Sequence, residues 1–266
     1  MELNKIYNED CLETMARMND NFVDLTVTSP PYDNLRTYND NIDETWGEHV
    51  WKPIIKELFR VTKNGGIVVW VVGDATIDGS ETGTSFRQAL YFMECGFKLH
   101  DTMIYAKNNP IPLTHNRYEQ QFEYMFVLSK GKPKTFNPIM IKTDTFGSKN
   151  NWNYSKGNEN KYATRKRKKI TKTSLTKQRL NIWFYNVGLN DKTLHTAPFP
   201  EKLAYDHILS WSNEKDLIYD PFMGSGTTAK MAHLSKRNWI GSELSKEYCD
   251  IAEKRLDPYL RQKTLF

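Results

Sequence analysis

A glycine-rich turn in the last quarter of the chain limits the folds that this sequence can adopt. The apolar run LIY at residues 217–219 is followed by DPFMGSGTTA at residues 220–229. Gly224, Gly226 and Ala229 have the spacing G-x-G-x-x-G/A, in which glycines allow a tight strand-to-helix turn and let a ligand approach the backbone. Glu243 lies nineteen positions after Gly224, where such folds place a ribose-binding carboxylate. The segment therefore predicts one strand–helix unit of a Rossmann-like sheet.

A rigid corner follows a second strand-like run near the N-terminus. In FVDLTVT at residues 22–28, the apolar residues at 23, 25 and 27 alternate at period two, which is typical of a strand. The strand ends at the next motif, because two consecutive prolines have no backbone N–H and hold the chain extended. The motif supplies a hydroxyl group, free carbonyl groups and an aromatic ring, which suit a planar base that bears an amine. Its residues are Ser29, Pro30, Pro31 and Tyr32.

Strands and helices alternate along most of the chain. Apolar residues recur at helical spacing over 11–18, 51–61 and 86–95, from 200 onward and after 243, with strand-like runs between them. The apolar run IVVWVV at residues 67–72 is typical of a central parallel strand. The pattern predicts an α/β fold with a Rossmann-like, doubly wound, mostly parallel sheet. We expect the core to comprise residues 1–139 and 186–266, with a basic insertion at 140–185.

The expected insertion is rich in positive charge. Residues 161–180 contain nine basic residues and no acidic one, with aromatic residues interleaved or adjacent. Lysine and arginine neutralise phosphates, and aromatic rings stack on bases, so the segment is the best candidate for nucleic-acid recognition. For any single lysine, a solvated charged loop is the simpler interpretation. The residues expected to contact nucleic acid are Lys161, Arg165, Lys166, Arg167, Lys168 and Lys169.

Composition excludes several classes of protein. The 266 residues are 39% hydrophobic, which is enough for a sizeable core. The longest apolar runs are too short to span a bilayer, and no secretory leader is visible. The three cysteines are scattered and no His or Cys pair has metal-ligand spacing, so we expect neither a disulfide framework nor a metal site.

Several blocks together resemble a known family, the S-adenosylmethionine-dependent DNA amino-methyltransferases of the N4-cytosine/N6-adenine type. The order of the blocks is similar to the branch in which the target-amine motif, here Ser-Pro-Pro-Tyr, precedes the cofactor motif. Glu9 departs from the pattern, because the family often has a glycine there. The blocks are NEDCL at 8–12, TSPPY at 28–32, RVTKNGG at 60–66, YMFVLSKG at 124–131, HTAPFPE at 195–201, DPFMGSGTT at 220–228 and GSELS at 241–245.

The resemblance implies a role for each matching residue. Asp10 and the backbone at Cys11 would bind the adenine of the cofactor, and Glu243 would bind its ribose. A simple helix cap is the rival interpretation for Asp10, and a core aromatic is the rival for Phe199. The residues that would line or close the pocket for the methionine part are Phe199, Pro200, Asp220, Phe222, Gly224, Ser225, Gly226 and Thr227.

The proposed chemistry of the rigid corner is direct transfer to an exocyclic amine. Ser29 Oγ and the Pro30 carbonyl can accept the two N–H hydrogens of the amine, which frees a lone pair otherwise delocalised into the ring. Tyr32 would stack on a base that has been flipped out of the duplex. Positioning and electrostatics would lower the barrier, and no covalent enzyme intermediate is required.

The serine bears on the choice of base. Ser-Pro-Pro-Tyr resembles enzymes that act on N4 of cytosine, whereas Asp or Asn in the first position is more usual for N6 of adenine. The alternatives are an N6-adenine enzyme, an RNA methyltransferase and a silent nucleic-acid-binding module. The expected partner is double-stranded DNA, and relatives often accompany a cognate restriction endonuclease or pair as homodimers. The resemblance implies a cytoplasmic protein of a bacterium or phage, with no membrane partner.

Overall fold

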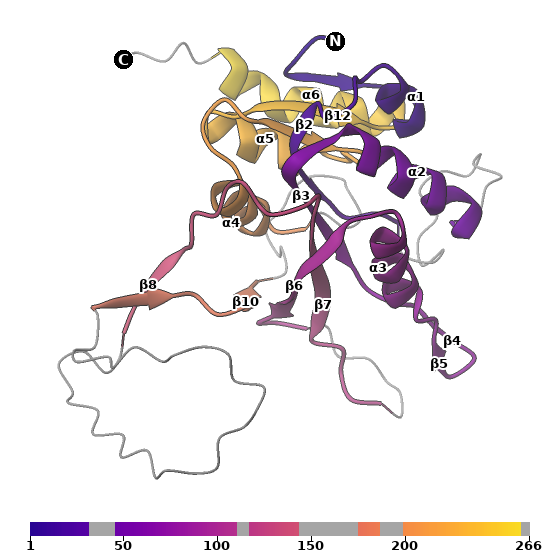
Figure 1. Cartoon of the computed structure of the whole chain (residues 1–266), viewed down its shortest axis with the longest axis vertical. Coiled ribbons are helices and arrows are strands. Elements are labelled where there is room, and N and C mark those ends of the chain that lie inside the picture. The colour runs from indigo at the N-terminus through magenta and orange to yellow at the C-terminus, as the bar shows by residue number, and fades with distance from the viewer. Residues whose placement is uncertain (32–45, 111–116, 144–174, 187–198, 262–266) are drawn as a thin grey trace. The chain divides into compact units, whose positions relative to one another are not determined.

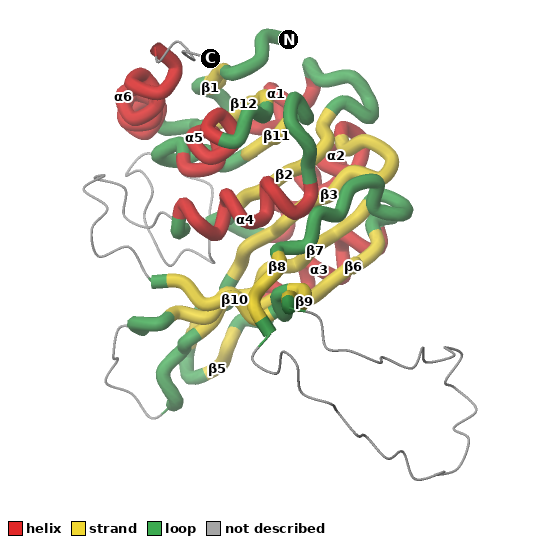
Figure 2. The backbone as a smooth tube through the Cα atoms, turned by 90° about the vertical axis from the view of Figure 1, so that its left-hand side faces the viewer, coloured by secondary structure: helices red, strands yellow, loops and turns green. Residues whose placement is uncertain are grey.

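One eight-stranded sheet organises the chain in the computed structural model, which describes residues 1–31, 46–110, 117–143, 175–186 and 199–261. The strand order is β1–β12–β11–β2–β3–β7–β6–β10 (Figures 1 and 2). The strands in that order are β1 (Lys5–Tyr7), β12 (Asn238–Ser242), β11 (Leu217–Asp220), β2 (Val23–Thr28), β3 (Thr62–Val72), β7 (Phe122–Ser129), β6 (Lys98–Lys107) and β10 (Ile182–Tyr185).

Most neighbouring strands of the sheet run parallel. The five strands from β1 to β3 are parallel to one another, and β10 is parallel to β6. β7 is antiparallel to both of its neighbours, β3 and β6. The predicted fold class, a doubly wound and mostly parallel α/β sheet, is confirmed. The antiparallel direction of β7 was not predicted, because no side-chain pattern in the sequence records the direction of a strand.

Helices cover both faces of the sheet. One group lies on one face and contains α1 (Cys11–Ala16), α2 (Glu48–Val61) and α3 (Thr84–Glu94). The other group contains α4 (Glu201–Trp211), α5 (Thr227–Leu234) and α6 (Lys246–Arg261) (Figures 1 and 2). Among the described residues, no helix is both long and apolar enough to cross a membrane.

The core under the first group explains why these helices form where they do. Trp51, Ile55 and Leu58 of α2 fall at helical spacing and are buried against the sheet. Trp70 of β3 contacts Phe92 of α3 edge to face, with 5.1 Å between ring centroids. Successive residues of a strand point to opposite faces, so Val69 and Val71, also fully buried, face the second group.

Part of the expected basic insertion belongs to a second compact unit of the chain. The chain divides into one unit of Met1–Asn137 with Asn181–Phe266 and a second of Pro138–Leu180. The second unit contains β8 (Met140–Lys142) paired antiparallel with β9 (Thr176–Gln178). The expected insertion extended to residue 185, but residues 182–185 form β10 of the central sheet. The four-residue strand Ile182–Tyr185 is too short to give a clear pattern beside the basic segment.

Residues 62–66 lie between the expected helix at 51–61 and the expected strand at 67–72. They form the first part of β3, which begins at Thr62 directly after α2. Gly65 has a φ of +83°, so the two glycines allow an irregular start of the strand rather than a helix cap. A two-stranded hairpin, β4 (Thr76–Ile77) with β5 (Ser80–Glu81), was also not predicted.

Candidate active site

The predicted site residues follow the carboxyl ends of neighbouring parallel strands. Asp10 follows β1, Glu243 follows β12, Asp220 ends β11, and Ser29 follows β2. Carboxyl ends of parallel strands share one edge of a sheet, and ligands of open α/β folds bind there, where the chain order of the strands reverses. In this sheet the reversal lies between β11 and β2. The structure therefore brings these four residues to one edge.

The glycine-rich turn adopts a backbone that favours glycine. Gly224 has a φ of +52° and Gly226 a φ of +81°, both in the left-handed region. A Cβ atom on Gly226 would lie 3.0 Å from Cβ of Ala252 in α6, which is closer than side chains normally approach. Gly226 is the N-cap of α5, so the turn leads directly into a helix N-terminus. The absence of a side chain at Gly226 therefore lets the turn pack closely on α6.

Glu243 accepts hydrogen bonds with both carboxylate oxygens. Gly224 N donates to Oε2 and Ser245 N donates to Oε1, each at 2.8 Å. Burial raises the pKa of Glu243, although these backbone N–H groups act in the opposite direction. Each carboxylate oxygen has two acceptor sites, so the bonds fix the orientation of the side chain and leave capacity for ligand hydroxyl groups.

Asp220 is a buried carboxylate at the start of the turn, and it is only 1% exposed. Its Oδ1 accepts from Thr28 Oγ1 at 2.6 Å and from Phe222 N at 3.0 Å. Burial raises the pKa of Asp220 to about 6, against the hydrogen bonds from Thr28 and the Phe222 backbone. A buried carboxylate of this kind suits a ligand that carries an ammonium group.

Asp10 and Cys11 lie at the start of α1. Asp10 is the N-cap residue of the helix, and its Oδ1 accepts from Leu12 N at 2.7 Å. This is the contact that the helix-cap interpretation predicted, and it leaves the second carboxylate oxygen outside that bond. Cys11 is buried, and burial raises the pKa of its thiol well above the ordinary value, so the thiol is a poor nucleophile at neutral pH.

The aromatic candidates flank the turn. Phe222 is half-buried and contacts two tryptophan rings edge to face, Trp46 at 5.5 Å and Trp70 at 6.1 Å between centroids. Phe199 is half-buried, and Pro200 is the N-cap of α4. Its fixed φ of −58° suits the start of a helix.

The rigid corner begins where expected, but part of the predicted site lies outside the described residues. Thr28 is the last residue of β2, Ser29 and Pro31 are half-buried, and Pro30 is buried. Tyr32 lies outside the described residues. The same holds for the six basic residues expected to contact nucleic acid: Lys161, Arg165, Lys166, Arg167, Lys168 and Lys169.

Arg255 of α6 is a site residue that sequence reasoning missed. Its Nη1 donates to the carbonyl oxygen and Oγ of Ser225 and to Oγ1 of Thr227, at 3.0 to 3.1 Å. Its Nη2 donates to Glu201 Oε1 at 2.5 Å, and Lys230 also pairs with that carboxylate. A guanidinium group with this set of contacts fixes the glycine turn against the start of α4. The sequence contains no signal for this role, because polar residues are expected on the outer side of any amphipathic helix.

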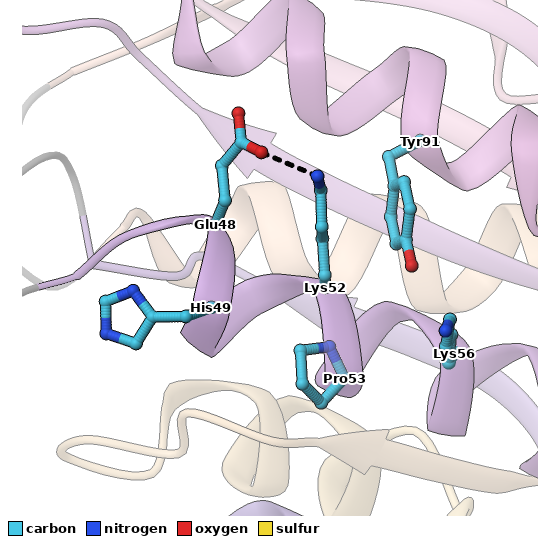
Figure 3. Close-up of a pocket in the computed structure, with 6 residues that line it drawn as sticks. All are labelled: Glu48, His49, Lys52, Pro53, Lys56 and Tyr91. Atoms are coloured by element: carbon cyan, nitrogen blue, oxygen red, sulfur yellow. Dashed lines mark ion pairs between the residues drawn. The ribbon is translucent and has the colours of Figure 1, made fainter.

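A shallow hollow of about 500 Å³ lies on the surface of α2 and α3 (Figure 3). None of the predicted site residues lines it. Lys52 forms an ion pair of 2.6 Å with Glu48, so part of its charge is already balanced. The residues that line the hollow are Glu48, His49, Lys52, Pro53, Lys56 and Tyr91. Among the described residues, no cluster of His, Cys, Asp or Glu could hold a metal ion.

A sheet with two carboxylates and a glycine turn at its carboxyl edge is the arrangement of a nucleotide-type cofactor site, and comparisons with known proteins identify the family. The chain belongs to the N6/N4 DNA methylase family, whose model, described as DNA methylase, matches residues 23–254. The orphan methyltransferase M.BamHII of Bacillus amyloliquefaciens is 54% identical over 253 residues, which cover 90% of each chain. The type II methyltransferase M.BglII of Bacillus subtilis is 30% identical and covers 94% of this chain and 68% of its own.

Solved structures agree with this assignment. The crystal structure of an M1.HpyAVI–SAM complex matches with a TM-score of 0.63 at 25% identity and covers 95% of this chain and 98% of its own. The PvuII DNA methyltransferase (cytosine-N4-specific) shares the fold, with a TM-score of 0.69 at 19% identity, and covers 98% of this chain and 87% of its own. The protein is therefore a site-specific DNA methyltransferase of the N4/N6 family that uses S-adenosylmethionine.

Proposed function

We propose that this enzyme methylates the exocyclic N4 amine of cytosine in double-stranded DNA. The observation that carries the proposal is the position of Ser29, directly after the buried strand β2 and one residue from the hydroxyl group that hydrogen-bonds Asp220. A serine hydroxyl before two prolines can accept from an amine without bearing a charge. The resemblance of Ser-Pro-Pro-Tyr to cytosine-N4 enzymes supports the choice of base.

The residues of the chain then have distinct roles. Ser29 Oγ and the Pro30 carbonyl accept the two N–H hydrogens, which favours a pyramidal nitrogen with a free lone pair. Tyr32 stacks on the flipped base. S-adenosylmethionine supplies the methyl group when it is bound. Because no charged nucleophile is generated on the protein, positioning of the amine carries most of the rate enhancement.

The cofactor pocket is proposed to use the two carboxylates of the strand edge. Asp220 balances the ammonium group of the methionine part, and Glu243 accepts from the ribose hydroxyl groups. Asp10 and the backbone at Cys11 form hydrogen bonds with the adenine. The glycine turn and the aromatic side of the pocket complete it, and their residues are Phe199, Pro200, Phe222, Gly224, Ser225, Gly226 and Thr227. The buried acceptors at the strand ends and the left-handed turn support this fit.

The test is the identity of the methylated base. The purified protein is incubated with S-adenosylmethionine and unmethylated genomic DNA, and the digested nucleosides are quantified by mass spectrometry. We expect N4-methylcytosine, and none from a Ser29→Ala variant that still binds the cofactor. N6-methyladenine would overturn the choice of base, whereas methylation of RNA alone would overturn the DNA substrate.

DNA binding is proposed to involve the basic segment at residues 161–169. Phosphate contacts release counterions, so the affinity should fall steeply as salt rises. Replacing Lys166, Arg167, Lys168 and Lys169 together by glutamine should flatten the salt dependence of DNA binding while the affinity for S-adenosylmethionine is unchanged. An unaltered salt slope would remove this segment from the interface.

The biological setting is proposed by analogy with relatives. The relatives named type II methyltransferases support a role in restriction-modification in the cytoplasm of a bacterium or phage. The most similar relative reported above is named an orphan methyltransferase, which supports action without a cognate endonuclease. Methylation of DNA by the purified chain alone, followed by sequencing of the modified sites, gives the recognition sequence and allows a search for a matching endonuclease activity.

Pairing of two copies is proposed to use the exposed face of α3. Phe86, Leu90 and Met93 lie at helical spacing on that face and are exposed. Two copies of α3 packed antiparallel would set Arg87 of one against Glu94 of the other, because these residues flank the apolar stripe at opposite ends. Sedimentation of the wild type and of Leu90→Lys tests this, and a wild-type monomer contradicts it.

A further inference from the structure

Two buried hydroxyl groups join the strand that leads to Ser29 to the turn that begins at Asp220. Thr28 Oγ1 donates a hydrogen bond of 2.6 Å to Asp220 Oδ1 across 192 residues of sequence. Thr228 Oγ1 donates one of 3.1 Å to the carbonyl oxygen of Val27, beside Thr28. Thr28 is fully buried and Thr228 is 1% exposed, so neither bond competes with bulk water. Together they connect β2, β11 and the first turn of α5.

The carboxylate at the centre of this connection depends on neutral donors. Burial raises the pKa of Asp220, whereas hydrogen bonds from Thr28 and Phe222 N lower it, and no cationic side chain of the described residues contributes. The titratable groups that interact with Asp220 are Glu243 at the end of β12 and Tyr219 in β11, and neither supplies positive charge. The hydroxyl group of Thr28 therefore matters for keeping the carboxylate ionised and oriented.

We propose that Thr28 is a positioning residue, which holds the Asp220 carboxylate for the cofactor and fixes Ser29, the next residue of the chain, relative to it. The inference rests on the proposed function, in which Asp220 binds the cofactor and Ser29 binds the target amine. Methyl transfer between two bound molecules depends on their relative position, and a displacement of about 1 Å costs a large factor in rate. The buried hydrogen bond of 2.6 Å between Thr28 and Asp220 joins the two motifs and fixes their relative position.

The matched control for Thr28 lies two residues earlier in the same strand. Thr26 is also fully buried in β2, but its hydroxyl group has no hydrogen-bond partner among the described residues. Thr26→Val and Thr28→Val make the same change of shape at the same depth, and valine favours a strand. Thr28→Ser keeps the hydroxyl group and removes only the methyl group.

The experiment measures the dissociation constant for S-adenosylmethionine by calorimetry without DNA, from about pH 5.5 to 9, and kcat and KM for methyl transfer. We expect Thr28→Val to weaken cofactor binding about tenfold at neutral pH, the loss typical of one hydrogen bond to a charged group. We also expect the acid limb of its binding profile to move to higher pH, because Asp220 loses a donor that lowers its pKa. Thr28→Ser should restore the wild-type limb, and Thr26→Val should leave it unchanged.

A purely structural role for Thr28 would not move the acid limb. The proposal is wrong if Thr28→Val has the same affinity and the same pH profile as Thr26→Val. If Thr28→Val does not fold, Thr28→Ala is measured in its place with the same expectation. A wild-type protein that binds S-adenosylmethionine but methylates no DNA would contradict the proposed function, and the binding comparison would still test Thr28.

Discussion

Replacement of Asp220 by asparagine should make the protein more stable at neutral pH while weakening cofactor binding. The carboxyl group is buried, and its pKa is raised from an ordinary 3.8 to about 6. Between these two values the folded protein holds a proton that the unfolded chain has released, so the free energy of unfolding falls as pH rises. One pKa unit corresponds to about 1.4 kcal/mol, so the wild type loses about 3 kcal/mol by neutral pH.

The amide of Asp220→Asn cannot ionise, and its oxygen can still accept from Thr28 and from Phe222 N. We therefore expect the variant and the wild type to have similar free energies of unfolding near pH 4. Above pH 6 the variant should be more stable by up to about 3 kcal/mol, and this difference in the free energy of unfolding should no longer change with pH. Urea denaturation followed by tryptophan fluorescence at a series of pH values measures the difference. A difference that is constant from pH 4 to 8 refutes the reasoning.

Glu201→Gln is the control of opposite sign. Burial raises the pKa of Glu201, but hydrogen bonds and charges of Lys230 and Arg255 outweigh it and hold the pKa below its ordinary value. A lowered pKa contributes stability that is present above the ordinary value and lost as pH falls through the lowered one. Glu201→Gln should therefore destabilise the protein at neutral pH, where Asp220→Asn stabilises it.

Three further predictions concern the turn and its supports. Gly226→Ala should lower the free energy of unfolding by about 1–2 kcal/mol in urea titrations, since φ is +81° and the new Cβ would press on Ala252; an unchanged midpoint would contradict this. Arg255→Lys keeps the charge but loses the planar guanidinium group that holds the turn, so calorimetry should find S-adenosylmethionine bound about tenfold more weakly. The control Arg261→Lys, on the exposed end of α6, should bind S-adenosylmethionine normally. Glu243→Gln should abolish most cofactor binding, because one oxygen that accepts a backbone N–H is replaced by a donor; normal affinity would exclude its ribose role.

Local sequence was sufficient for the elements that position the site. The alternating run before Ser29 and the apolar runs at 67–72 and 217–219 are strands, because such runs bury both faces of a sheet. The spacing of Gly224 and Gly226 predicted a strand-to-helix turn, and both residues have the left-handed φ that glycine permits. Of the acidic motif residues, Asp220 ends β11, Glu243 directly follows β12, and Asp10 lies in the turn after β1.

Strand direction and short strands were beyond the reach of local patterns. β7 pairs antiparallel with β3 and β6, although a parallel strand would bury the same apolar residues. β10 was assigned to the basic insertion, because Ile182–Tyr185 is too short for a periodic signal and its burial depends on β6.

The sequence by itself determined the longer elements, the order of the motifs and the candidate residues for a cofactor and an amine, because each depends on a few neighbouring residues. Only the tertiary structure decided which distant groups touch. Thr28 reaches Asp220 because β2 and β11 are adjacent in the sheet, and Arg255 reaches Ser225 because α6 packs on α5. Burial then sets the pKa of Asp220, since desolvation depends on everything that surrounds the carboxylate and on no single residue beside it in the chain.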